Sequence, residues 1–232
     1  GSWNTPLLTE GVVNCGPDDY VYSRHTVHVH RGFDPYVPDL NVVPMGYCSS
    51  VRLGNASAGA QREAIRYTID VDTNEFALFS MTYALVEVNP RHPVEEQPKF
   101  LLKITDTLNV PIDDCYDINF VAGGNVPGWH SVPGYTFEWM DWQTVGLDLT
   151  PLHGQRIYVW VENYDCSVGG HFGYAYFAMR GMDKLIASEF CGEAENGLLR
   201  APAGFNYRWY RTDNPSVTLS TADTMAVTSA GD

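Results

Sequence analysis

The stretch EAIRYTIDVDTNEFALFSMTYALVEV, residues 63–88, alternates in its first half and is apolar in nearly all of its second half. Ile65, Tyr67 and Ile69 are separated by polar residues, which is typical of a strand with one face in a core and the other toward water. Residues 76–88 are apolar on both faces, as expected of a central strand that is covered on each side. The polar segment between the two halves predicts a turn.

Short β-forming stretches recur along the rest of the chain, separated by turns rich in glycine, proline and asparagine. A strand that ends at Leu149 is followed by a short turn and at once by another strand, which indicates antiparallel pairing. With about nine strands and no helical crossovers, the sequence predicts an all-β fold, an antiparallel β-sandwich of the jelly-roll type. The further strands are expected within residues 99–107, 117–122, 135–149, 156–163 and 171–179.

The chain has 232 residues, with 14 Lys and Arg against 28 Asp and Glu, and a net charge of -14 at pH 7. Such a chain repels phosphate backbones and anionic lipid headgroups, so we expect no nucleic-acid partner. It contains no run of about 18 apolar residues, so we expect no membrane insertion. The 44% of hydrophobic residues suffices for a packed core. One large sandwich domain is expected over residues 1–186.

The sequence changes in character beyond Ile186 and predicts a second segment, residues 187–232. Cys191 is followed by a short apolar stretch, a turn with proline and glycine, and then Trp209. This is the order of a strand-B cysteine and a strand-C tryptophan in an immunoglobulin-like domain. We therefore expect a partial Ig-like or PKD-like segment after the sandwich.

Five cysteines are widely spaced, and none forms the Cys-x-x-Cys pair typical of zinc or redox sites. Disulfides in an exported protein explain them better. The four cysteines of the sandwich allow three connectivities, of which we favour Cys15 with Cys48 and Cys115 with Cys166. In the chain-entropy model each bridge would stabilise the fold by ~4 kcal/mol. The partner of Cys191 is then expected outside this sequence.

Three stretches together are specific enough to suggest a family: SVRLGNASAGAQREAIRYTI (50–69), VEVNPRHPVEEQPKFLLKI (86–104) and DCSVGGHFGYAYF (165–177). They resemble a recurrent module in very large secreted surface proteins of gliding and gut bacteria that use the type IX secretion route, gliding-motility adhesins among them. The resemblance implies a jelly-roll sandwich followed by Ig-like or PKD-like repeats. It also implies a secreted or cell-surface location, and adhesion or glycan contact without a known catalytic residue.

The segment DCSVGGHFGYAYFAM, residues 165–179, has the composition of an active-site loop. Its paired glycines allow backbone angles closed to other residues and can turn the chain into the next strand. No serine or cysteine nucleophile signature accompanies His171, so we interpret it as a structural hydrogen-bonding residue rather than a catalytic one. The resemblance implies an acidic residue near Ala178, and its replacement here argues against a cation site that would use it.

Two short patterns are compatible with metal binding. His28 and His30 stand two apart, so on a strand they would share a face and could bind one transition-metal ion. A solvated strand face is the alternative. Asp70, Asp72 and Asn74 bring together the hard oxygen ligands that Ca²⁺ prefers, although the loop lacks the pattern of an EF-hand. We predict a calcium ion there or at the aspartates of residues 113–117, with a polar hairpin turn as the alternative.

Adjacent Glu95 and Glu96 suggest a glycosidase with one acid and one base or nucleophile. Neighbouring residues of an extended segment point to opposite faces, so these two could not flank one bond. A structural loop, with either carboxylate paired to Arg91 or to a backbone amide, is the simpler interpretation.

Aromatic residues gather in the stretch GGNVPGWHSVPGYTFEWMDW, residues 123–142. Exposed aromatic rings can stack on the faces of sugars. We predict a ligand-binding platform of Trp129, His130 and Tyr135. Three residues apart on one strand, Trp139 and Trp142 are expected on opposite faces.

These observations predict a non-catalytic adhesion module of a larger exported protein. Its expected partners are a glycan or a surface protein, together with the neighbouring domains of the same chain. Two alternatives stay open: a polysaccharide hydrolase or lyase on a similar sandwich, and a structural spacer between repeats.

Overall fold

The computed structural model describes residues 18–112, 117–124, 127–190 and 197–227. By its internal contacts the chain divides into two compact units. The first comprises Gly1–Asp70, Thr82–Gln143 and Gln155–Ala178, and the second Val71–Met81, Thr144–Gly154 and Met179–Asp232. Among the described residues, no helix has the length and apolar character needed to cross a membrane.

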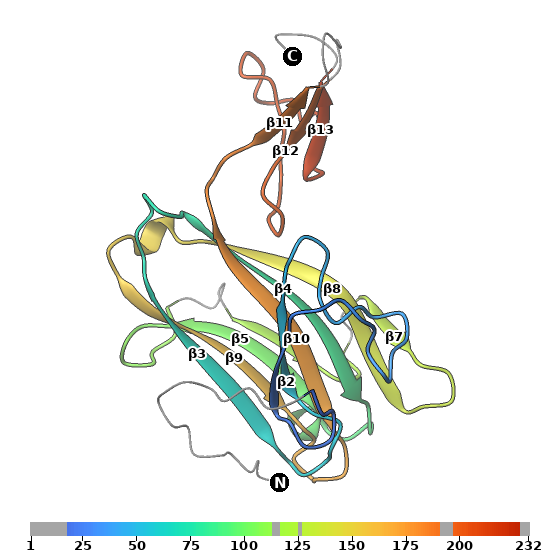
Figure 1. Cartoon of the computed structure of the whole chain (residues 1–232). Coiled ribbons are helices and arrows are strands. Elements are labelled where there is room, and N and C mark those ends of the chain that lie inside the picture. The colour runs from blue at the N-terminus through green and yellow to red at the C-terminus, as the bar shows by residue number, and fades with distance from the viewer. Residues whose placement is uncertain (1–17, 113–116, 125–126, 191–196, 228–232) are drawn as a thin grey trace. The chain divides into compact units, whose positions relative to one another are not determined.

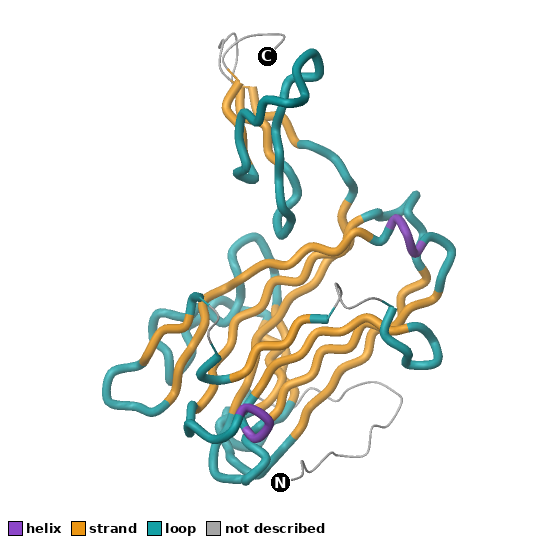
Figure 2. Tube along the Cα trace, turned by 180° about the vertical axis from the view of Figure 1, so that it is seen from behind, coloured by secondary structure: helices purple, strands orange, loops and turns teal. Residues whose placement is uncertain are grey.

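Nearly all regular structure in the described ranges is antiparallel β-sheet, which confirms the predicted fold class, and two sheets form the layers of a sandwich (Figures 1 and 2). One sheet has the order β1 (His25–His28), β2 (Ser50–Gly54), β10 (Gly173–Met182), β4 (Leu78–Val88), β8 (Phe137–Asp148) and β7 (Trp129–Ser131). The other has the order β3 (Arg62–Asp70), β9 (Arg156–Tyr164), β5 (Lys99–Thr105) and β6 (Ile118–Val121). Short 3₁₀ helices are η1 (Val94–Glu96) and η3 (Thr150–Leu152).

The chain passes repeatedly between the two sheets: β3 to β4, β4 to β5, β8 to β9 and β9 to β10 each join one layer to the other. Such alternation is typical of jelly-roll sandwiches. The turn predicted between the first two strands is present, and the amide of Glu75 donates to the carbonyl of Asp72 at 3.0 Å. It connects strands of different sheets.

The central strand β4 confirms its prediction, because all 11 of its residues are buried and it lies between β10 and β8. Tyr83 points into the sandwich, with its ring 5.6 Å from that of Phe100 on β5 and 5.2 Å from that of Phe120 on β6. Val86 and Val88 face the opposite way, into a second hydrophobic cluster. A strand with a core on both faces has to be apolar on both.

The alternating strand β3 lies at the edge of its sheet, paired with β9 alone. Its apolar residues are less buried than predicted: Ile65 and Ile69 are half-buried and Tyr67 is 36% exposed. Opposite them on β9, Val161 and Ile157 are fully buried. An edge strand has one neighbour only, so the same alternation buries less of its surface.

The second hydrophobic cluster lies on the outer face of the six-stranded sheet, against a loop that follows β1. The rings of Tyr174 and Tyr176, both from β10, form part of it and are fully buried. Because this face is covered, both sides of the six-stranded sheet are packed. The loop residues in the cluster are Val37, Leu40, Val42 and Val43.

Asp34 anchors this loop and is only 2% exposed. Its carboxylate accepts hydrogen bonds from the backbone amides of Tyr36 and Val37, both at 2.8 Å. The hydroxyl groups of Tyr174 and Tyr176 donate to the same carboxylate at 2.9 and 2.7 Å. We call Asp34, Tyr174 and Tyr176 the Asp34 cluster. It ties the loop to β10 through a buried charge whose oxygens are both hydrogen-bonded.

Trp139 and Trp142 both pack against the second hydrophobic cluster, so the prediction of opposite faces is wrong. Trp142 donates its indole N–H to the carbonyl of Asn41 at 2.8 Å. Its backbone amide is bound by the side chain of Asp141 at 2.7 Å. Two residues three apart on a strand can reach one face only if the two-residue alternation is interrupted between them.

Beyond the sandwich strands, β11 (Ala187–Phe190), β12 (Gly197–Arg200) and β13 (Thr224–Val227) form a three-stranded antiparallel sheet. Trp209 forms an isolated bridge with Ser220 and donates its indole N–H to the carbonyl of Ala222 at 2.8 Å. The domain boundary at residue 186 and the Ig-like character of the second segment stay predictions.

Candidate functional site

The candidate site is a pocket of about 460 Å³ at the end of the sandwich where β4 ends and where β8 and β10 begin. Residues directly after β4, the connection from β7 into β8, and a residue of the loop before β10 line it. We call it the end pocket. Its lining includes Asn89, Arg91, Tyr135, Glu138 and His171.

Tyr135 is the exposed aromatic wall of the end pocket, with 65% of its surface accessible. One side of its ring packs on Phe137, at 4.9 Å between ring centroids. The turn before it is fixed by Gly134, which has a φ of 83°, and by the hydrogen bond from the Tyr135 amide to the carbonyl of Val132 at 3.1 Å. A ring that is supported from behind and open in front can stack on the apolar face of a sugar.

Asn89 organises the polar side of the end pocket. Its Oδ1 accepts hydrogen bonds from the amide of Arg91 at 3.0 Å and from Nε2 of Gln97 at 3.2 Å, and its Nδ2 donates to Glu138 at 3.2 Å. Arg91 has a φ of 59°, in the left-handed region that few non-glycine residues adopt. The Asn89 side chain holds the backbone in this conformation, and the exposed Arg91 and the half-buried Glu138 both belong to the pocket lining.

Glu87 directly precedes Val88 of the pocket lining and is fully buried. Neither of its carboxyl oxygens has a hydrogen-bond partner among the residues that the structure describes. Burial, and then the charge of Glu138, raises the pKa of Glu87 well above its ordinary value. Its environment therefore favours the protonated carboxyl group over the carboxylate.

Further unpaired polar atoms gather around this end of the sandwich. Oε1 of Gln97, Oδ1 of Asn163 and Nδ1 of His171 are buried without a hydrogen-bond partner within the described part of the chain. Asp165 is paired, since it accepts the amides of Gln61 and Gly173 at 3.0 and 3.1 Å. Burial nevertheless raises the pKa of Asp165 to about 7. Buried polar groups of native proteins are nearly always satisfied, so a group of unsatisfied ones indicates a place for a ligand, an ion or water.

The structure changes the interpretation of His171. Its backbone carbonyl accepts the amide of Cys166 at 3.0 Å, which closes the loop. Its side chain, which we interpreted as hydrogen-bonded, has the unpaired Nδ1 described above and stands edge-on to His92, with ring centroids 5.2 Å apart. Burial, followed by the neighbouring His92, lowers the pKa of His171.

The three residues of the predicted platform do not form one surface. On β7, Trp129 is half-buried opposite the buried Met140, whereas His130 is paired with Trp139, at 4.7 Å between rings. Adjacent strand residues point to opposite faces, so Trp129 and His130 cannot act together. Of the three, Tyr135 alone lines the end pocket.

The predicted calcium ligands have protein partners. Arg156 donates to both carboxylate oxygens of Asp70 at 2.6 and 2.9 Å and lowers the pKa of Asp70. Asp72 accepts the backbone amide and the side-chain amide of Asn74 at 2.9 and 2.8 Å, which lowers the pKa of Asp72. These bonds describe a closed polar turn, and the calcium site stays a prediction. Asp113 and Asp114 lie outside the described residues.

The other candidate residues lie apart from the end pocket. His28 is buried beside the rings of Tyr20 and Tyr176, and burial lowers its pKa, whereas His30 is exposed. Glu95 and Glu96 lie on the 3₁₀ helix η1 instead of an extended segment, and neither lines the end pocket.

Cys48 is exposed and Cys166 is buried, and neither forms a disulfide with another cysteine of the described residues. Their predicted disulfide partners, Cys15 and Cys115, lie outside the described residues. The two bridges therefore stay predictions.

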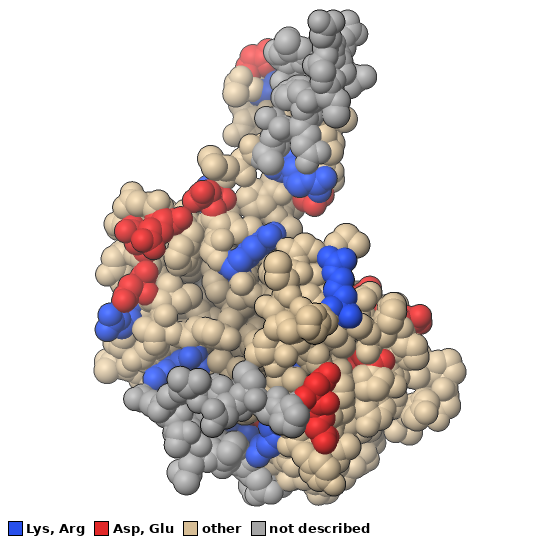
Figure 3. Space-filling view, in the orientation of Figure 1, with Lys and Arg blue, Asp and Glu red and all other residues tan. Residues whose placement is uncertain are grey.

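A second feature that sequence reasoning missed is the outer face of the four-stranded sheet, where cations alternate with aromatic rings. The guanidinium of Arg66 stands 4.4 Å from the ring of Tyr158 and 5.5 Å from that of Trp160, while Nζ of Lys103 stands 5.7 Å from Trp160. We call Arg66, Lys103, Tyr158 and Trp160 the basic face. Figure 3 shows basic and acidic side chains interspersed over the surface on the side seen in Figure 1.

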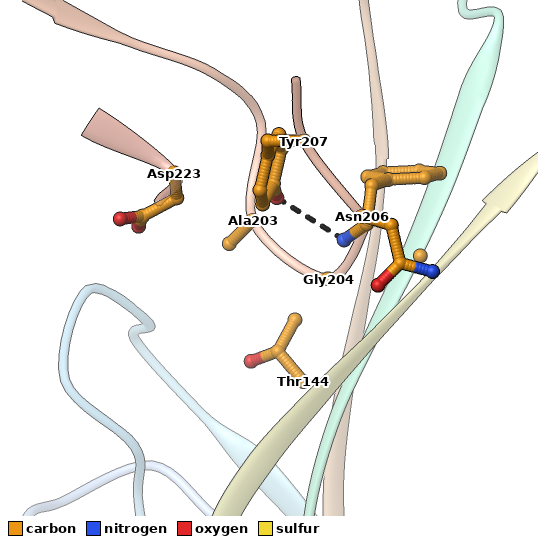
Figure 4. Close-up of a pocket in the computed structure, with 8 residues that line it drawn as sticks. Thr144, Ala203, Gly204, Asn206, Tyr207 and Asp223 are labelled. Carbon is orange, nitrogen blue, oxygen red and sulfur yellow. Dashed lines mark hydrogen bonds between the residues drawn. The ribbon is translucent and has the colours of Figure 1, made fainter. Parts of the chain in front are cut away.

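The second unit has a pocket of its own, of about 570 Å³ (Figure 4). The hydroxyl of Tyr207 accepts a hydrogen bond from the amide of Phe205 at 3.1 Å and donates one to the carbonyl of Pro202. Both of these hydrogen bonds are made within its own loop. The end pocket, with polar groups that face outward, is the better candidate. The second pocket is lined by Thr144, Gly146, Ala203, Gly204, Phe205, Asn206, Tyr207 and Asp223.

The sequence indicated Tyr135 but not Asn89, Arg91 or Glu138. The one available signal was the segment NPRHP directly after the apolar strand, because an Asn-Pro step favours a tight turn at a strand end. Glu138 lies between Phe137 and Trp139, and no local pattern marked it as a binding residue.

No known family profile matches the chain, and no curated protein matches it in sequence. Among solved structures, the chain is similar to TmCBM61 in complex with β-1,4-galactotriose, at 10% identity and a TM-score of 0.37 over 68% of this chain and 82% of that one. It is also similar to the enzymatically active domain of bacteriophage CBA120 tailspike protein 4, at 14% identity and a TM-score of 0.30, over 68% and 20% of the two chains. The glycoside hydrolase domain of Endo-D from Streptococcus pneumoniae R6 follows, at 9% identity and a TM-score of 0.30, over 89% and 32%. Similarities this distant carry no argument about function.

Proposed function

We propose that this chain is a non-catalytic module that binds a glycan in the end pocket and serves adhesion as part of a larger exported protein. The observation that carries the proposal is the exposed ring of Tyr135 beside a fixed set of donors and acceptors on Asn89, Arg91 and Glu138. A sugar offers an apolar ring face and a rim of hydroxyl groups. Binding sites for such ligands combine aromatic walls with a few placed polar groups.

The location at the cell surface and the type IX route are supported by the resemblance of the three sequence stretches. Two of those stretches, residues 86–104 and 165–177, supply Asn89, Arg91 and His171 to the end pocket. The residues that carry the resemblance and the residues of the proposed site therefore coincide in part.

Binding without cleavage is supported by the carboxyl groups. Glycoside hydrolysis commonly uses two carboxyl groups, roughly 5–9.5 Å apart, on either side of the scissile bond. Among the residues that line the end pocket, Glu138 is the one carboxylate. Glu87, whose pKa the charge of Glu138 helps to raise, is fully buried and does not belong to the lining.

The test is a glycan array followed by calorimetry with the best-bound sugar. We expect Tyr135→Ala and Arg91→Ala each to weaken binding about tenfold or more, as truncation of a central contact commonly does. Tyr22→Ala is the matched control, because this tyrosine is 82% exposed and lies outside the end pocket. Equal affinity of Tyr135→Ala and wild type would overturn the site.

The basic face provides an internal comparison. Arg66→Ala and Tyr158→Ala remove a cation and a ring from the outer face of the four-stranded sheet. We expect both variants to keep wild-type affinity. Loss of binding in these variants, with Tyr135→Ala unaffected, would move the glycan site to the basic face.

A hydrolase stays the second candidate, because Glu138 in the pocket lining and the buried Glu87, whose pKa is raised by burial and by Glu138, are carboxyl groups in unequal environments. A reducing-end assay on the bound polysaccharide decides between the two. We expect no turnover, and turnover that Glu138→Gln abolishes would establish the enzyme. If no glycan binds in the array, the spacer interpretation replaces both.

A further inference from the structure

Three potential metal ligands meet behind the end pocket: His92, Cys166 and His171. Nδ1 of His92 lies 3.2 Å from Sγ of Cys166, and one ligand atom from each of the three residues lies within 4.8 Å of the others. A tetrahedral zinc ion, with Zn–N near 2.0–2.1 Å and Zn–S near 2.3 Å, holds its ligand atoms roughly 3.3–3.8 Å apart. The ligand atoms therefore have to approach one another by at most about 1–1.5 Å to match the spacing around an ion.

The burial and hydrogen bonding of these groups indicate a missing partner. Cys166 is fully buried and free, and Nδ1 of His171 is buried without a hydrogen-bond partner in the described residues. A buried nitrogen without a hydrogen-bond partner destabilises the fold through its lost hydration, unless an ion or a ligand binds it. A metal ion would bind this nitrogen and would replace the contact between Sγ of Cys166 and His92 by bonds to both side chains.

The backbone presents the ligands on two fixed loops. The amide of Cys166 donates to the carbonyl of His171, and the amide of Gly169 donates to the carbonyl of Cys166, both at 3.0 Å. Gly169, with a φ of 87°, makes this tight loop possible. His92 follows Arg91, whose amide is held by Asn89 at 3.0 Å. Ligands on loops held in this way need little ordering when an ion binds.

The donor types select the metal. A thiolate and two imidazoles suit zinc and other transition-metal ions, whereas Ca²⁺ and Mg²⁺ prefer oxygen. With three protein ligands, a fourth coordination position is left for solvent or a ligand. His171 belongs both to this group and to the lining of the end pocket. The fourth coordination position of a bound ion would therefore lie near the pocket.

We propose that His92, Cys166 and His171 form a binding site for a divalent transition-metal ion of the zinc type. Binding deprotonates the Cys166 thiol, and its proton is released to solvent. The site excludes the predicted Cys115–Cys166 disulfide, because a sulfur in that bridge is no thiolate ligand. The proposal does not depend on glycan binding, because its test measures the binding of the metal ion directly.

The test uses the purified chain, stripped with a chelator and titrated with Co²⁺ and then Zn²⁺. We expect one ion per chain and a thiolate-to-cobalt charge-transfer absorption that Zn²⁺ displaces. Cys166→Ser should abolish that absorption, and His92→Gln and His171→Gln should weaken binding about tenfold or more. Cys48→Ser and His153→Ala are the matched controls, because both residues are exposed and stand outside the group.

A thermal melt gives a second readout. Zn²⁺ should raise the Tm of wild type, because an ion that binds the folded state alone stabilises it, and the rise should vanish in His171→Gln. This histidine is partly exposed, so the variant keeps the test open even if Cys166→Ser does not fold. Failure to bind an ion, binding that Cys166→Ser and His171→Gln leave unchanged, or a Cys115–Cys166 bridge in non-reducing peptide mapping would overturn the proposal.

Discussion

The Asp34 cluster and the region around the end pocket each contain a buried acidic side chain, but these side chains differ in their hydrogen bonding. Asp34 is buried with two backbone amides and two tyrosine hydroxyl groups on its carboxylate. Glu87 is buried with no hydrogen-bond partner for either oxygen in the described residues. The first carboxyl group is surrounded by donors, while the second lies near Glu138, another acid.

We infer from this difference that Asp34 has a structural role, whereas Glu87 lies close to a functional site. A satisfied buried charge holds a loop to a sheet and has no capacity left for a ligand. Buried polar groups without hydrogen-bond partners lower the stability of the fold. Several of them in one region therefore indicate a functional site in that region. The predictions below test whether the two regions behave in these two ways.

The largest effect is expected for Asp34→Ala. The substitution leaves two tyrosine hydroxyl groups and two amides without their acceptor beneath the loop, so we expect a loss of about 3–5 kcal/mol in the free energy of unfolding. Urea denaturation measures it. Asp39→Ala, at an exposed position of the same loop, is the control. A loss no larger than that of the control would show that the cluster does not hold the loop.

Glu87→Gln should act in the opposite direction. The folded pKa of Glu87 lies above the ordinary value of 4.5, so the folded state keeps a proton that the unfolded state releases, and wild-type stability falls as the pH rises above about 4.5. The neutral amide removes this dependence, so we expect Glu87→Gln to be more stable than wild type at pH 8, with the difference shrinking toward pH 4.5. Denaturation between pH 4 and 8 measures it.

The exposed Glu95 provides the control for this experiment, since Glu95→Gln should leave the pH profile unchanged. Part of the slope will persist in Glu87→Gln, because the pKa of Asp165, raised to about 7, acts in the same direction. An unchanged stability of Glu87→Gln across the pH range would mean that this carboxyl group has a partner in solution.

A smaller effect is expected for Asn89→Ala, which removes the acceptor of the Arg91 amide and the donor to Glu138. We expect a loss of about 1 kcal/mol in stability. Glycan affinity should fall several-fold, because the left-handed turn at Arg91 loses its support. Parallel denaturation and calorimetry measure the two quantities. Full glycan affinity in this variant would show that the turn does not position the binding groups.

The smallest effect is expected for Arg156→Gln at the start of β9, where Arg156 pairs with Asp70 at the end of β3. The Asp70–Arg156 pair is exposed on both sides, and water and salt screen such pairs. We expect no measurable change in the urea midpoint, at low or high salt. A clear salt-dependent loss would show that surface pairs contribute more to this sandwich than its buried polar groups suggest.

The sequence alone was sufficient for the class of fold and for its central strand. The apolar residues 76–88 predicted a strand with both faces covered, and β4 is buried along its whole length. Side-chain alternation is a local property, because it depends on residues two positions apart, and it can therefore be read without knowing the rest of the chain. The position of a strand in its sheet is different: β3 alternates as predicted, yet its edge position leaves Tyr67 partly exposed.

The sites depend on contacts between distant parts of the chain. Asp34 and Tyr176 are 142 positions apart and share a hydrogen bond, and His92 meets Cys166 over 74 positions. No local pattern at either member of such a pair indicates the other. The pairs form because strand order and crossovers place loops from remote segments at the same end of the sandwich, and that order follows from how all the strands bury their surfaces together.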